Sequence, residues 1–564
     1  MKPGGTRFMD LLNRFANAVS FKDYDDFYNH FRLNVPENFN YAYDVVDEYA
    51  AIDPDKRALV WCDDAENERI FTFADLKELS DKAANFFLSE GMTKGDRVLV
   101  ILQRRYEYWI TLMALSKIGA IAIPATHMLM EKDIVYRMGK SGAKGIVCVN
   151  EDELCENIRR AAAKVPGIGF MATIGKREGF IDFTQACEQC SDALNIPYKT
   201  QRTANDTFLI YFTSGTTGMP KMVCLSQRYT LGHIVTAKYW QNCSDGGLHF
   251  TLAETGWAKA SWGKIFGQWV CGSAVFVYDF HGKFEADDLL KHITKYKITT
   301  FCAPPTVYRF LIKTDLSKYD LSSIQYMLTA GEALNPEIVR QIQLKTGHKI
   351  YEGFGQTETT VVCATFPRYL PIRPGSMGRP SPLYDVQLLD DEDNPIEEGA
   401  GEICIRLREE QEGLFDGYYC DEKLTATVKH DGYYHMGDLA YRDSDGYYWY
   451  VGRKDDVIKS SGYRIGPFEV ESALMEHPAV LECAITGVPD TEGVRGQLVK
   501  ATVVLAKGYV ASDELRKELQ NHVKKTTAPY KYPRIVEFVE ELPKTISGKI
   551  RRVEIREKDV SKHI

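Results

Sequence analysis

From Phe71 onward, short apolar segments of β character alternate with amphipathic segments that have helical periodicity. Helical patterns cover residues 73–91 and 106–118, and the first apolar β segments cover 97–102 and 120–123. Further β segments follow at 145–149, 208–212, 273–278, 299–301 and 326–329. This alternation predicts an α/β fold with parallel-rich sheets covered by helices.

A chain of 564 residues is too long for one hydrophobic core, so we expect more than one domain. Between about 380 and 450, short strands alternate with Asp-Gly turns, which predicts a small antiparallel β subdomain. A charged link, Arg453–Asp456, then precedes a compact unit of mixed helices and strands. We predict a large N-terminal domain over 1–453, a hinge over 454–456 and a small, mobile α+β C-terminal domain over 457–564. The polar and aromatic residues 1–45 are expected to wrap the surface.

Charge and composition argue against several classes of function. The 69 basic and 78 acidic residues leave a net charge of −9 without a long basic run, so nucleic-acid and anionic-membrane binding are not expected. The N-terminus lacks the apolar core of a signal peptide, and the best apolar run, 118–124, is too short to cross a bilayer. Thirteen cysteines without framework spacing suit a reducing compartment, and we expect a cytoplasmic location.

The segment Thr213–Lys221 places four hydroxyls, two glycines and a lysine directly behind an apolar strand. Glycines let backbone N–H groups approach a polyphosphate, hydroxyls donate to its oxygens, and lysine adds a mobile charge. The segment does not fit the Walker pattern. It favours phosphate binding, with a polar surface turn as the alternative.

Two further clusters suit a nucleotide site. Tyr351–Glu358 combines glycines with Thr357, a hydroxyl for phosphate, and Glu358, a hard oxygen ligand for Mg²⁺. Tyr434–Leu439 contains Asp438, whose carboxylate can accept hydrogen bonds from two ribose hydroxyls. An N-capped β-to-helix turn and a simple turn aspartate are the respective alternatives.

The last two clusters contain charged residues. Val451–Asp456 with Ser460–Arg464 forms a charged, glycine-containing link, for which a solvated linker is the alternative. Pro543–Lys549 presents Lys549 on a Ser-Gly turn, and exposed lysines are usually only solvated.

Together, and in this order, the five segments resemble the acyl-adenylate-forming superfamily over essentially the whole chain. The sequence is more closely similar to medium-chain acyl-CoA synthetases, AMP-forming enzymes, of the archaeal and bacterial type. The segments that carry this similarity are Glu254–Trp262, Phe301–Tyr308, Ser461–Glu471 and Thr527–Arg534.

The resemblance implies a two-step acid–thiol ligase. A carboxylate attacks the α-phosphorus of ATP to give an acyl adenylate and pyrophosphate, and the thiol of CoA then takes the acyl group and releases AMP. Such phosphoryl chemistry depends on positioning and charge stabilisation. The resemblance thus implies that ATP and CoA are co-substrates and that Mg²⁺ is a cofactor. It also implies that the acid substrate has a short or medium chain, branched or unbranched.

The resemblance assigns catalytic roles to Lys549, Thr357 and Glu358, with Glu358 as the Mg²⁺ ligand. The ATP and AMP contacts that it implies are Thr213, Ser214, Gly215, Thr216, Thr217, Gly218, Met219, Pro220, Lys221, Glu332, Glu352, Gly353, Phe354, Gly355, Gln356, Thr357, Asp438, Arg453 and Arg464.

In the family, the small domain rotates between the two steps about a hinge that corresponds here to Asp455. One of its faces presents Lys549 for adenylation, and another presents 461–463 beside the thiol tunnel. The CoA contacts that the resemblance implies are Ser461, Gly462, Tyr463, Arg495, Lys524, Tyr532, Pro533 and Arg534.

The implied acyl pocket contains Trp257, Lys259, Trp262 and Gly331. Aromatic walls favour an apolar tail, although two tryptophans also suit ordinary core packing. Lys259 is unusual there and either closes the pocket or meets a polar acyl group. An aromatic acid, a carrier-protein thiol as acceptor, and a nucleotide-binding regulator without turnover are the alternatives. The identity of the acid stays open, and a homo-oligomer is compatible with the sequence.

Overall fold

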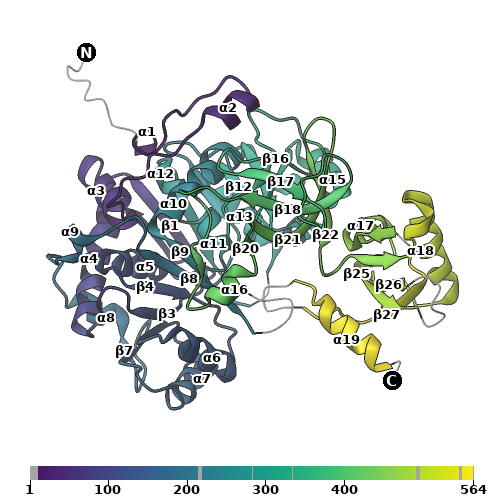
Figure 1. Cartoon of the computed structure of the whole chain (residues 1–564). Helices are drawn as coiled ribbons and strands as arrows, with labels where there is room; N and C mark the ends of the chain where they lie inside the picture. The colour runs from purple at the N-terminus through teal and green to yellow at the C-terminus, as the bar shows by residue number, and fades with distance from the viewer. Residues whose placement is uncertain are drawn as a thin grey trace.

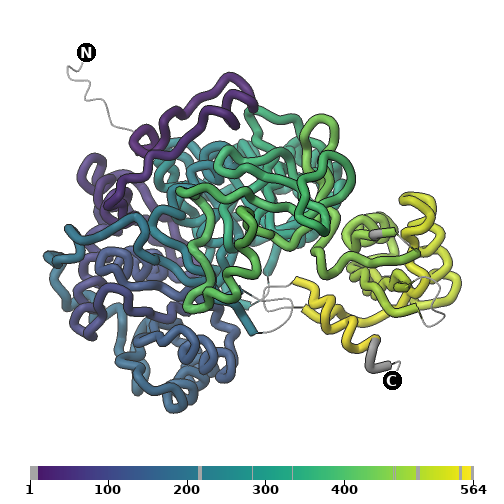
Figure 2. Tube along the Cα trace, in the orientation of Figure 1, coloured from purple at the N-terminus to yellow at the C-terminus, as the bar shows by residue number. Residues whose placement is uncertain are grey.

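The computed structural model describes residues 11–213, 219–282, 284–332, 334–461, 463–490, 496–544 and 549–562. These residues form two large sheets covered by helices and a smaller C-terminal unit that stands to one side (Figure 1). The trace in Figure 2 leaves the large body after β22 (Tyr448–Arg453), builds the small unit and returns toward the large body at α19 (Arg552–Lys562). The α/β fold class with a large first domain and a small second one is therefore confirmed.

The first sheet has eight strands in the order β19-β9-β8-β4-β3-β5-β6-β7. The pairs from β8 to β7 are parallel, and β9 adds to β8 as an antiparallel hairpin. The strands of this sheet are β3 (Arg97–Ile101), β4 (Ile121–Pro124), β5 (Gly145–Cys148), β6 (Phe170–Thr173), β7 (Ile181–Asp182), β8 (Thr207–Thr213), β9 (Lys221–Ser226) and β19 (Gly417–Tyr418).

The second sheet contains both parallel and antiparallel strand pairs. Its parallel part is flanked by two antiparallel edges, in the order β16-β15-β14-β13-β12-β10-β11-β1-β2. The strands of this part are β1 (Arg57–Asp63), β2 (Glu68–Thr72), β10 (Leu248–Thr251), β11 (Ala274–Asp279), β12 (Thr300–Cys302), β13 (Tyr326–Ala330), β14 (Ile350–Phe354), β15 (Cys363–Ala364) and β16 (Ser376–Pro380).

An antiparallel extension continues from β16 through β22, β21 and β18 to β17. It is the subdomain predicted between 380 and 450, and its Asp-Gly turns connect its strands. These strands are β17 (Asp385–Leu389), β18 (Ala400–Arg406), β20 (Lys429–His430), β21 (Tyr433–Arg442) and β22.

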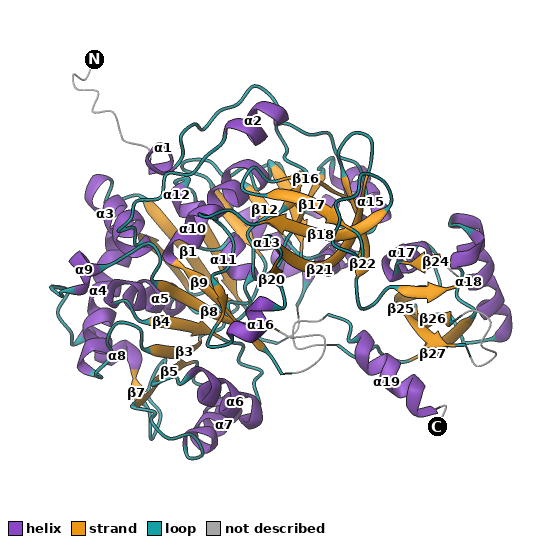
Figure 3. Ribbon diagram, in the orientation of Figure 1, coloured by secondary structure: helices purple, strands orange, loops and turns teal. Residues whose placement is uncertain are grey.

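Helices lie against both sheets (Figure 3). They are α1 (Leu11–Phe15), α2 (Tyr24–His30), α3 (Glu48–Ile52), α4 (Phe73–Ser89), α5 (Glu107–Ile118), α6 (Glu131–Ser141), α7 (Asp152–Ala162), α8 (Phe183–Glu188), α9 (Tyr198–Gln201), α10 (Gln227–Ile234), α11 (Lys259–Gly263), α12 (Phe266–Val270), α13 (Ala286–Tyr296), α14 (Pro305–Leu311), α15 (Pro336–Thr346) and α16 (Glu422–Ala426). Three shorter turns are the π-helices η1 (Ala42–Asp47) and η2 (Val235–Trp240) and the 3₁₀ turn η3 (Leu316–Lys318).

Local sequence explains where the longest of these helices begins. The Thr72 side chain accepts from the backbone N–H of Asp75, and the Asp75 carboxylate accepts from the N–H of Thr72. This reciprocal capping box satisfies two amide groups that a helix start leaves open. The apolar face of α4, including Phe73, Leu76 and Phe87, is buried against the core.

The small unit has its own hydrophobic core, which includes Ile465, Leu474, Val503 and Leu519. Its elements are β23 (Ile458–Ser460), β24 (Tyr463–Ile465), α17 (Pro467–Met475), β25 (Val480–Pro489), β26 (Gln497–Leu505), α18 (Asp513–Thr526), the 3₁₀ turn η4 (Pro529–Lys531), β27 (Ile535–Val539) and α19. Among the described residues, no helix has the length and apolar character needed to cross a membrane.

The N-terminal arm differs from the expected surface wrap. Its aromatic residues Phe15, Phe27, Phe31 and Phe39 are buried. Phe27 packs against Tyr239 with ring centroids 4.4 Å apart. Aromatic burial of this kind makes the arm part of the large core, because each ring removes a large apolar area from water.

Candidate functional site

The hairpin of β8 and β9 positions the ends of the predicted phosphate loop. Thr213 pairs directly with Lys221 across this hairpin, so the two ends of the loop lie side by side. Pro220 is held by Tyr136, whose hydroxyl donates to its carbonyl at 3.0 Å, and Met219 is exposed. Ser214, Gly215, Thr216, Thr217 and Gly218 lie outside the described residues.

Lys221 and Glu358 meet around one tyrosine. The ammonium of Lys221 lies 5.2 Å from the centre of the Tyr418 ring, and the Tyr418 hydroxyl donates to Glu358 Oε1 at 3.1 Å. Burial raises the pKa of Glu358, while Tyr418, Lys221 and Arg453 act in the opposite direction. Lys221, Tyr418 and Arg453, from three separate parts of the chain, thus surround one carboxylate that follows β14.

Both carboxylate oxygens of Asp438 have hydrogen-bond or ion-pair partners. Gln356 donates an amide N–H to Oδ2 at 2.6 Å, and the Tyr450 hydroxyl donates to Oδ1 at 3.1 Å. Arg453 lies opposite Asp438 in the β21–β22 register, with its guanidinium 3.5 Å from Oδ2. Burial raises the pKa of Asp438, and the Arg453 and Lys549 charges and these hydrogen bonds oppose that rise. The carboxylate is therefore pre-positioned at the end of the antiparallel extension.

Two further contacts connect Asp438 with the loop after β14. The Tyr434 hydroxyl donates to Gln356 Oε1 at 2.7 Å, and Gln356 also donates to the Met436 carbonyl at 2.7 Å. The backbone N–H of Gln356 donates to Thr359 Oγ1 at 2.9 Å, which shapes the turn that contains Thr357. The loop carrying Thr357 and Glu358 is thereby tied to β21.

Arg453 and Asp455 begin the link to the small unit. Arg453 donates to the Met436 carbonyl at 3.1 Å and lies 3.5 Å from Asp455 Oδ1. The next residue, Asp456, forms an ion pair with Arg556 of α19 and lies 3.9 Å from Arg552. Arg552 is in turn bound to Glu471 at 2.7 Å. The link is thus anchored on both sides by arginine–carboxylate pairs.

The small unit directs Lys549 toward the large one. The positive charge of Lys549 lowers the pKa values of both Asp438 and Lys259. Such effects fall off steeply with distance and screening, so the Lys549 charge lies near both groups. Lys549 and Asp438, predicted for catalysis and ribose contact, are therefore brought to one place.

The predicted adenine wall is built by β14 and its neighbours. Burial raises the pKa of Glu352 to about 8, and its Oε1 accepts from the Leu334 N–H at 3.4 Å. Glu332 accepts from Thr306 Oγ1 at 3.4 Å. The Phe354 ring lies 6.1 Å from that of Tyr450, between this wall and Asp438.

The two glycines of β14 and its following loop permit close packing. A Cβ on Gly353 would lie 2.6 Å from the Trp240 ring, and one on Gly355 would lie 2.5 Å from both the Thr360 carbonyl and the Trp262 ring. These glycines are therefore required for the tryptophans to approach the strand.

The predicted acyl pocket is narrow. Lys259 is partly buried at the start of α11 and donates to the Ala330 carbonyl at 2.6 Å; desolvation lowers its pKa. Trp262 packs edge-on against Trp240 at 6.3 Å. The space that Lys259 and Trp262 line is closed to water; its other walls are Trp240, Gln241, Thr251, Gly263, Cys302 and Ala330.

The other two predicted pocket residues, Gly331 and Trp257, are not among the residues that line this space. Gly331 has φ +97°, in the region that favours glycine, and a Cβ there would lie 3.8 Å from Lys259 Nζ. Trp257 precedes α11 and donates its backbone N–H to the Glu254 carbonyl. It does not line the closed space.

Some of the predicted CoA residues gather on the small unit. Lys524 and Arg534 lie over the Tyr532 ring, at 4.0 and 4.7 Å from its centre, and Pro533 accepts from Gln520 at 3.0 Å.

The turn between β23 and β24 carries the other described CoA residues. Ser461 has φ +52°, and the Tyr463 ring stacks on Tyr530 at 4.0 Å. Since Tyr530 and Tyr532 flank the end of η4, this turn adjoins the Lys524–Arg534 cluster. Gly462, Arg495 and the side chain of Arg464 lie outside the described residues; the Arg464 backbone belongs to β24.

Sequence reasoning missed the tyrosines that organise the site. Tyr418 donates to Glu358 and Tyr450 donates to Asp438, and neither tyrosine was among the predicted site residues. Tyr434, which donates to Gln356, was predicted only as the first residue of the segment that contains Asp438. Aromatic residues are common in strands, so only the pairing of β19 with β9 and of β22 with β21 reveals their role.

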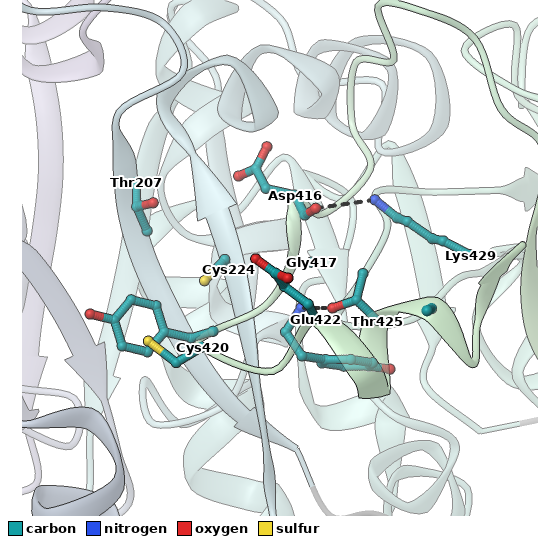
Figure 4. A pocket seen from close by; sticks show the side chains of 11 residues that line it. Thr207, Cys224, Asp416, Gly417, Cys420, Glu422, Thr425 and Lys429 are labelled. Atoms are coloured by element: carbon teal, nitrogen blue, oxygen red, sulfur yellow. Dashed lines mark hydrogen bonds between the residues drawn. The ribbon is translucent and has the colours of Figure 1, made fainter.

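A separate surface pocket of about 460 Å³ lies beside β19 (Figure 4). Lys429 donates to the Phe415 carbonyl at 2.6 Å and to the Asp416 carbonyl at 3.4 Å, and the Tyr418 N–H donates to Thr425 at 2.9 Å. These bonds hold the strand that presents Tyr418 to Glu358. None of the predicted site residues that the structure describes lines this pocket.

Comparison with known families and proteins adds to this geometry. A family model described as AMP-binding enzyme matches residues 46–419, and one described as AMP-binding enzyme C-terminal domain matches 469–549. Mouse (Mus musculus) acyl-coenzyme A synthetase ACSM3, mitochondrial, is 40% identical over 560 residues, covering 97% of this chain and 95% of that protein. Human acyl-coenzyme A synthetase ACSM4, mitochondrial, is 42% identical over 539 residues, covering 93% and 91%.

Solved structures are also similar. The anthranilate CoA ligase AuaEII in complex with anthranoyl-AMP has a TM-score of 0.85 and 27% identity, covering 94% of this chain and 99% of that one. The Brucella canis acyl-CoA synthetase has a TM-score of 0.68 and 33% identity, covering 93% and 95%.

Proposed function

The chain belongs to the AMP-binding enzyme family, and on this premise we propose that it is an ATP-dependent acyl-CoA synthetase. The observation that carries the proposal is the convergence of Asp438, Glu358 and Lys549. The buried carboxylate of Asp438, the partly exposed carboxylate of Glu358 and a lysine from a separate unit would form a site suited to a nucleotide and a carboxylic acid. The enzyme would form an acyl adenylate and then transfer the acyl group to CoA.

The relatives confirm the expectation of an acyl-CoA synthetase of the medium-chain group. The curated relatives named above are mammalian and mitochondrial, and the Brucella canis structure is bacterial. The archaeal and bacterial type therefore stays a prediction.

We assign the first step to positioning and charge. Thr213, Lys221 and the loop between them would hold the β- and γ-phosphates, and Asp438 would accept from the ribose hydroxyls. Lys549 would lie between the α-phosphate and the attacking carboxylate, where it offsets the negative charge of both. Asp438 is suited to its role because Gln356 and Tyr450 hold its two oxygens before any nucleotide arrives.

Mg²⁺ is the cation that we propose for the phosphates. Glu358 fits it, because its carboxylate is a hard oxygen donor beside the phosphate loop, with one oxygen oriented by Tyr418. When bound, Mg²⁺ would neutralise phosphate charge. Tyr418 then orients the carboxylate, while Lys221 supports its ionised form.

We propose that the chain divides at 454–456 and that Asp455 is the hinge. The ion pairs of Asp456 with α19 and the separate core of the small unit support rotation as a rigid body. In the present arrangement the charge of Lys549 acts on Asp438, which supports a place for Lys549 beside the nucleotide. Rotation would replace it with the Ser461–Tyr463 turn, and Lys524, Tyr532 and Arg534 would then bind the CoA nucleotide.

We propose a short- or medium-chain acid, branched or unbranched, as the substrate. Lys259 and Trp262 close the predicted pocket, so a long tail has no space in this direction. All thirteen cysteines are unpaired thiols, which suits the cytoplasm or another reducing compartment.

A panel of short, branched, medium-chain and aromatic acids tests the proposal. ATP–pyrophosphate exchange should require an acid, and AMP release should additionally require CoA. Exchange without acid dependence would indicate a nucleotide-binding regulator. Acyl transfer to a carrier protein but not to CoA would indicate the carrier-loading alternative.

A further inference from the structure

Three side chains of different chemistry meet on the antiparallel extension, away from the phosphate loop. Cys404 of β18 lies directly opposite His435 of β21 in the strand register. Glu402 is two residues before Cys404 and therefore projects from the same face of β18. All three are buried.

Their spacing matches that of ligands around a small cation. Cys404 Sγ lies 3.4 Å from His435 Nδ1, and Glu402 Oε2 lies 3.6 Å from the same nitrogen. With Zn–S near 2.3 Å and Zn–N or Zn–O near 2 Å, neighbouring ligands of tetrahedral zinc are separated by roughly 3.3–3.6 Å. The two contacts of His435 thus already have the edge lengths of such a site, and all three ligand atoms lie within 4.8 Å of one another.

The second ring nitrogen of His435 lies on the side of the ring away from Cys404 and Glu402, because both of these side chains approach Nδ1. His435 is more than nine-tenths buried, and its Nε2 has no hydrogen-bond partner within the described residues. Asp393 and His430 offer atoms within 4.8 Å of the same ring, and the His430 ring stacks on it at 4.0 Å. A metal-bound histidine commonly donates its second N–H to such a carboxylate.

We propose that Glu402, Cys404 and His435 form a binding site for a borderline-soft divalent cation of the Zn²⁺ class. Thiolate and imidazole ligands favour Zn²⁺ over the hard Mg²⁺ expected at Glu358, so the two sites select different ions. Cys404 binds as the thiolate and releases its proton to solvent. Three protein ligands leave the fourth position open.

The site also adjoins the hinge. Lys454 Nζ lies 2.7 Å from Glu402 Oε2, and Gly437 donates its N–H to Glu402 Oε1 at 2.9 Å. A cation bound to Oε2 competes with the Lys454 ammonium for the same oxygen. Occupancy of the site therefore releases Lys454, the first residue of the proposed hinge.

Cobalt titration of the full-length protein tests the proposal, with Co²⁺ as a visible probe for Zn²⁺. One equivalent should produce tetrahedral d–d bands and a thiolate charge-transfer band that Zn²⁺ abolishes. Cys404→Ser should remove the charge-transfer band. Cys483→Ser, which alters another buried cysteine outside the cluster, should retain it. An unchanged band in Cys404→Ser would overturn the proposal.

Two measurements do not depend on the folding of Cys404→Ser. X-ray absorption of the zinc-loaded, unmutated protein should give a first shell with one sulfur and otherwise nitrogen and oxygen. A shell with no sulfur, or with several, would contradict the proposed ligands. Lys454→Met should tighten Zn²⁺ binding about tenfold, because it removes a competing charge. Unchanged or weaker Zn²⁺ binding would contradict the proposed competition between Lys454 and the cation for Glu402.

Discussion

At the scale of single residues, the site depends on how tyrosines hold carboxylates. Glu358 accepts a hydrogen bond from the Tyr418 hydroxyl, and Asp438 accepts one from the Tyr450 hydroxyl. These bonds orient acceptor oxygens that the nucleotide, or a cation bound with it, would otherwise have to organise. Orientation before binding lowers the entropy cost of assembling the reacting groups.

Tyr418→Phe tests this orientation. Loss of a hydrogen bond to a charged group costs about 1.5–3 kcal/mol, which corresponds to roughly a tenfold or greater loss in adenylation rate at limiting Mg²⁺. Saturating Mg²⁺ should restore part of the rate, as measured by ATP–pyrophosphate exchange across a Mg²⁺ series. Tyr419→Phe, the neighbouring substitution, should leave the Mg²⁺ dependence unchanged. Equal Mg²⁺ profiles for Tyr418→Phe and the unmutated enzyme would contradict this role.

Glu352 should make stability depend on pH. Its pKa rises from an ordinary value of 4.5 to about 8 in the folded protein. The unfolded chain therefore loses this proton at lower pH than the folded chain does. Stability from this group is fully present below pH 4.5 and is lost as pH rises toward 8.

Denaturant unfolding of ligand-free protein at pH 5 and pH 8 measures this effect. The free energy of unfolding should fall more steeply with pH in the unmutated protein than in Glu352→Gln. Each unit of pKa shift corresponds to about 1.4 kcal/mol. Parallel pH profiles for the two proteins would show that Glu352 is not responsible.

At the scale of elements, the β15–β16 pair requires a glycine. Gly378 has φ +85°, and a Cβ there would lie 2.0 Å from the carbonyl carbon of Ala364 on the paired strand. Gly91 has a similar φ of +78° but nothing within 4 Å. Comparing alanine variants at the two positions therefore distinguishes the cost of backbone strain from the cost of steric overlap.

Gly378→Ala should destabilise the protein more than Gly91→Ala. The unfavourable φ alone costs about 1–2 kcal/mol in both variants. Overlap with backbone at Gly378 should add about 1–3 kcal/mol or more. Chemical denaturation measures the difference, and equal losses in the two variants would show that β16 relaxes around the added methyl group.

Regular elements were largely predictable, because helix and strand periodicities are local. The helix predicted over 106–118 is α5, Glu107–Ile118, and the β segment predicted over 97–102 is β3, Arg97–Ile101. The hairpin of β1 and β2 was missed, although it lies at the edge of the second sheet. The π-helices η1 and η2 were also missed, since their extra residue per turn leaves little trace in side-chain periodicity.

The site was predictable only in part. Motif residues such as Asp438 and Lys549 were found through an ordered resemblance, and the structure places them near each other. Tyr418 and Trp240 were not found. They reach the site through sheet pairing and helix packing over long sequence separations, which no local pattern records.

At the scale of the whole molecule, the proposed two-step mechanism requires the small unit to move. Asp455→Pro should impair the thioester step about 100-fold or more while leaving adenylation within a few-fold, because proline fixes φ at the hinge. Asp455→Ala removes the contact with Arg453 but keeps rotation free, so it should support both steps. Single-turnover assays of each half-reaction separate the outcomes. Equal loss of both steps in Asp455→Pro would move the hinge elsewhere.

In the proposed mechanism, Lys549 serves adenylation alone and must leave before CoA reacts. Lys549→Ala should reduce acid-dependent ATP–pyrophosphate exchange by about 10²–10³-fold, as expected for loss of one preorganised charge. Lys544→Ala is the matched control, because Lys544 pairs with Glu482 within the small unit. The decisive measurement is thioester formation by Lys549→Ala from supplied acyl adenylate and CoA. Near-normal formation is the predicted result, and a loss as large as that of adenylation would contradict the account.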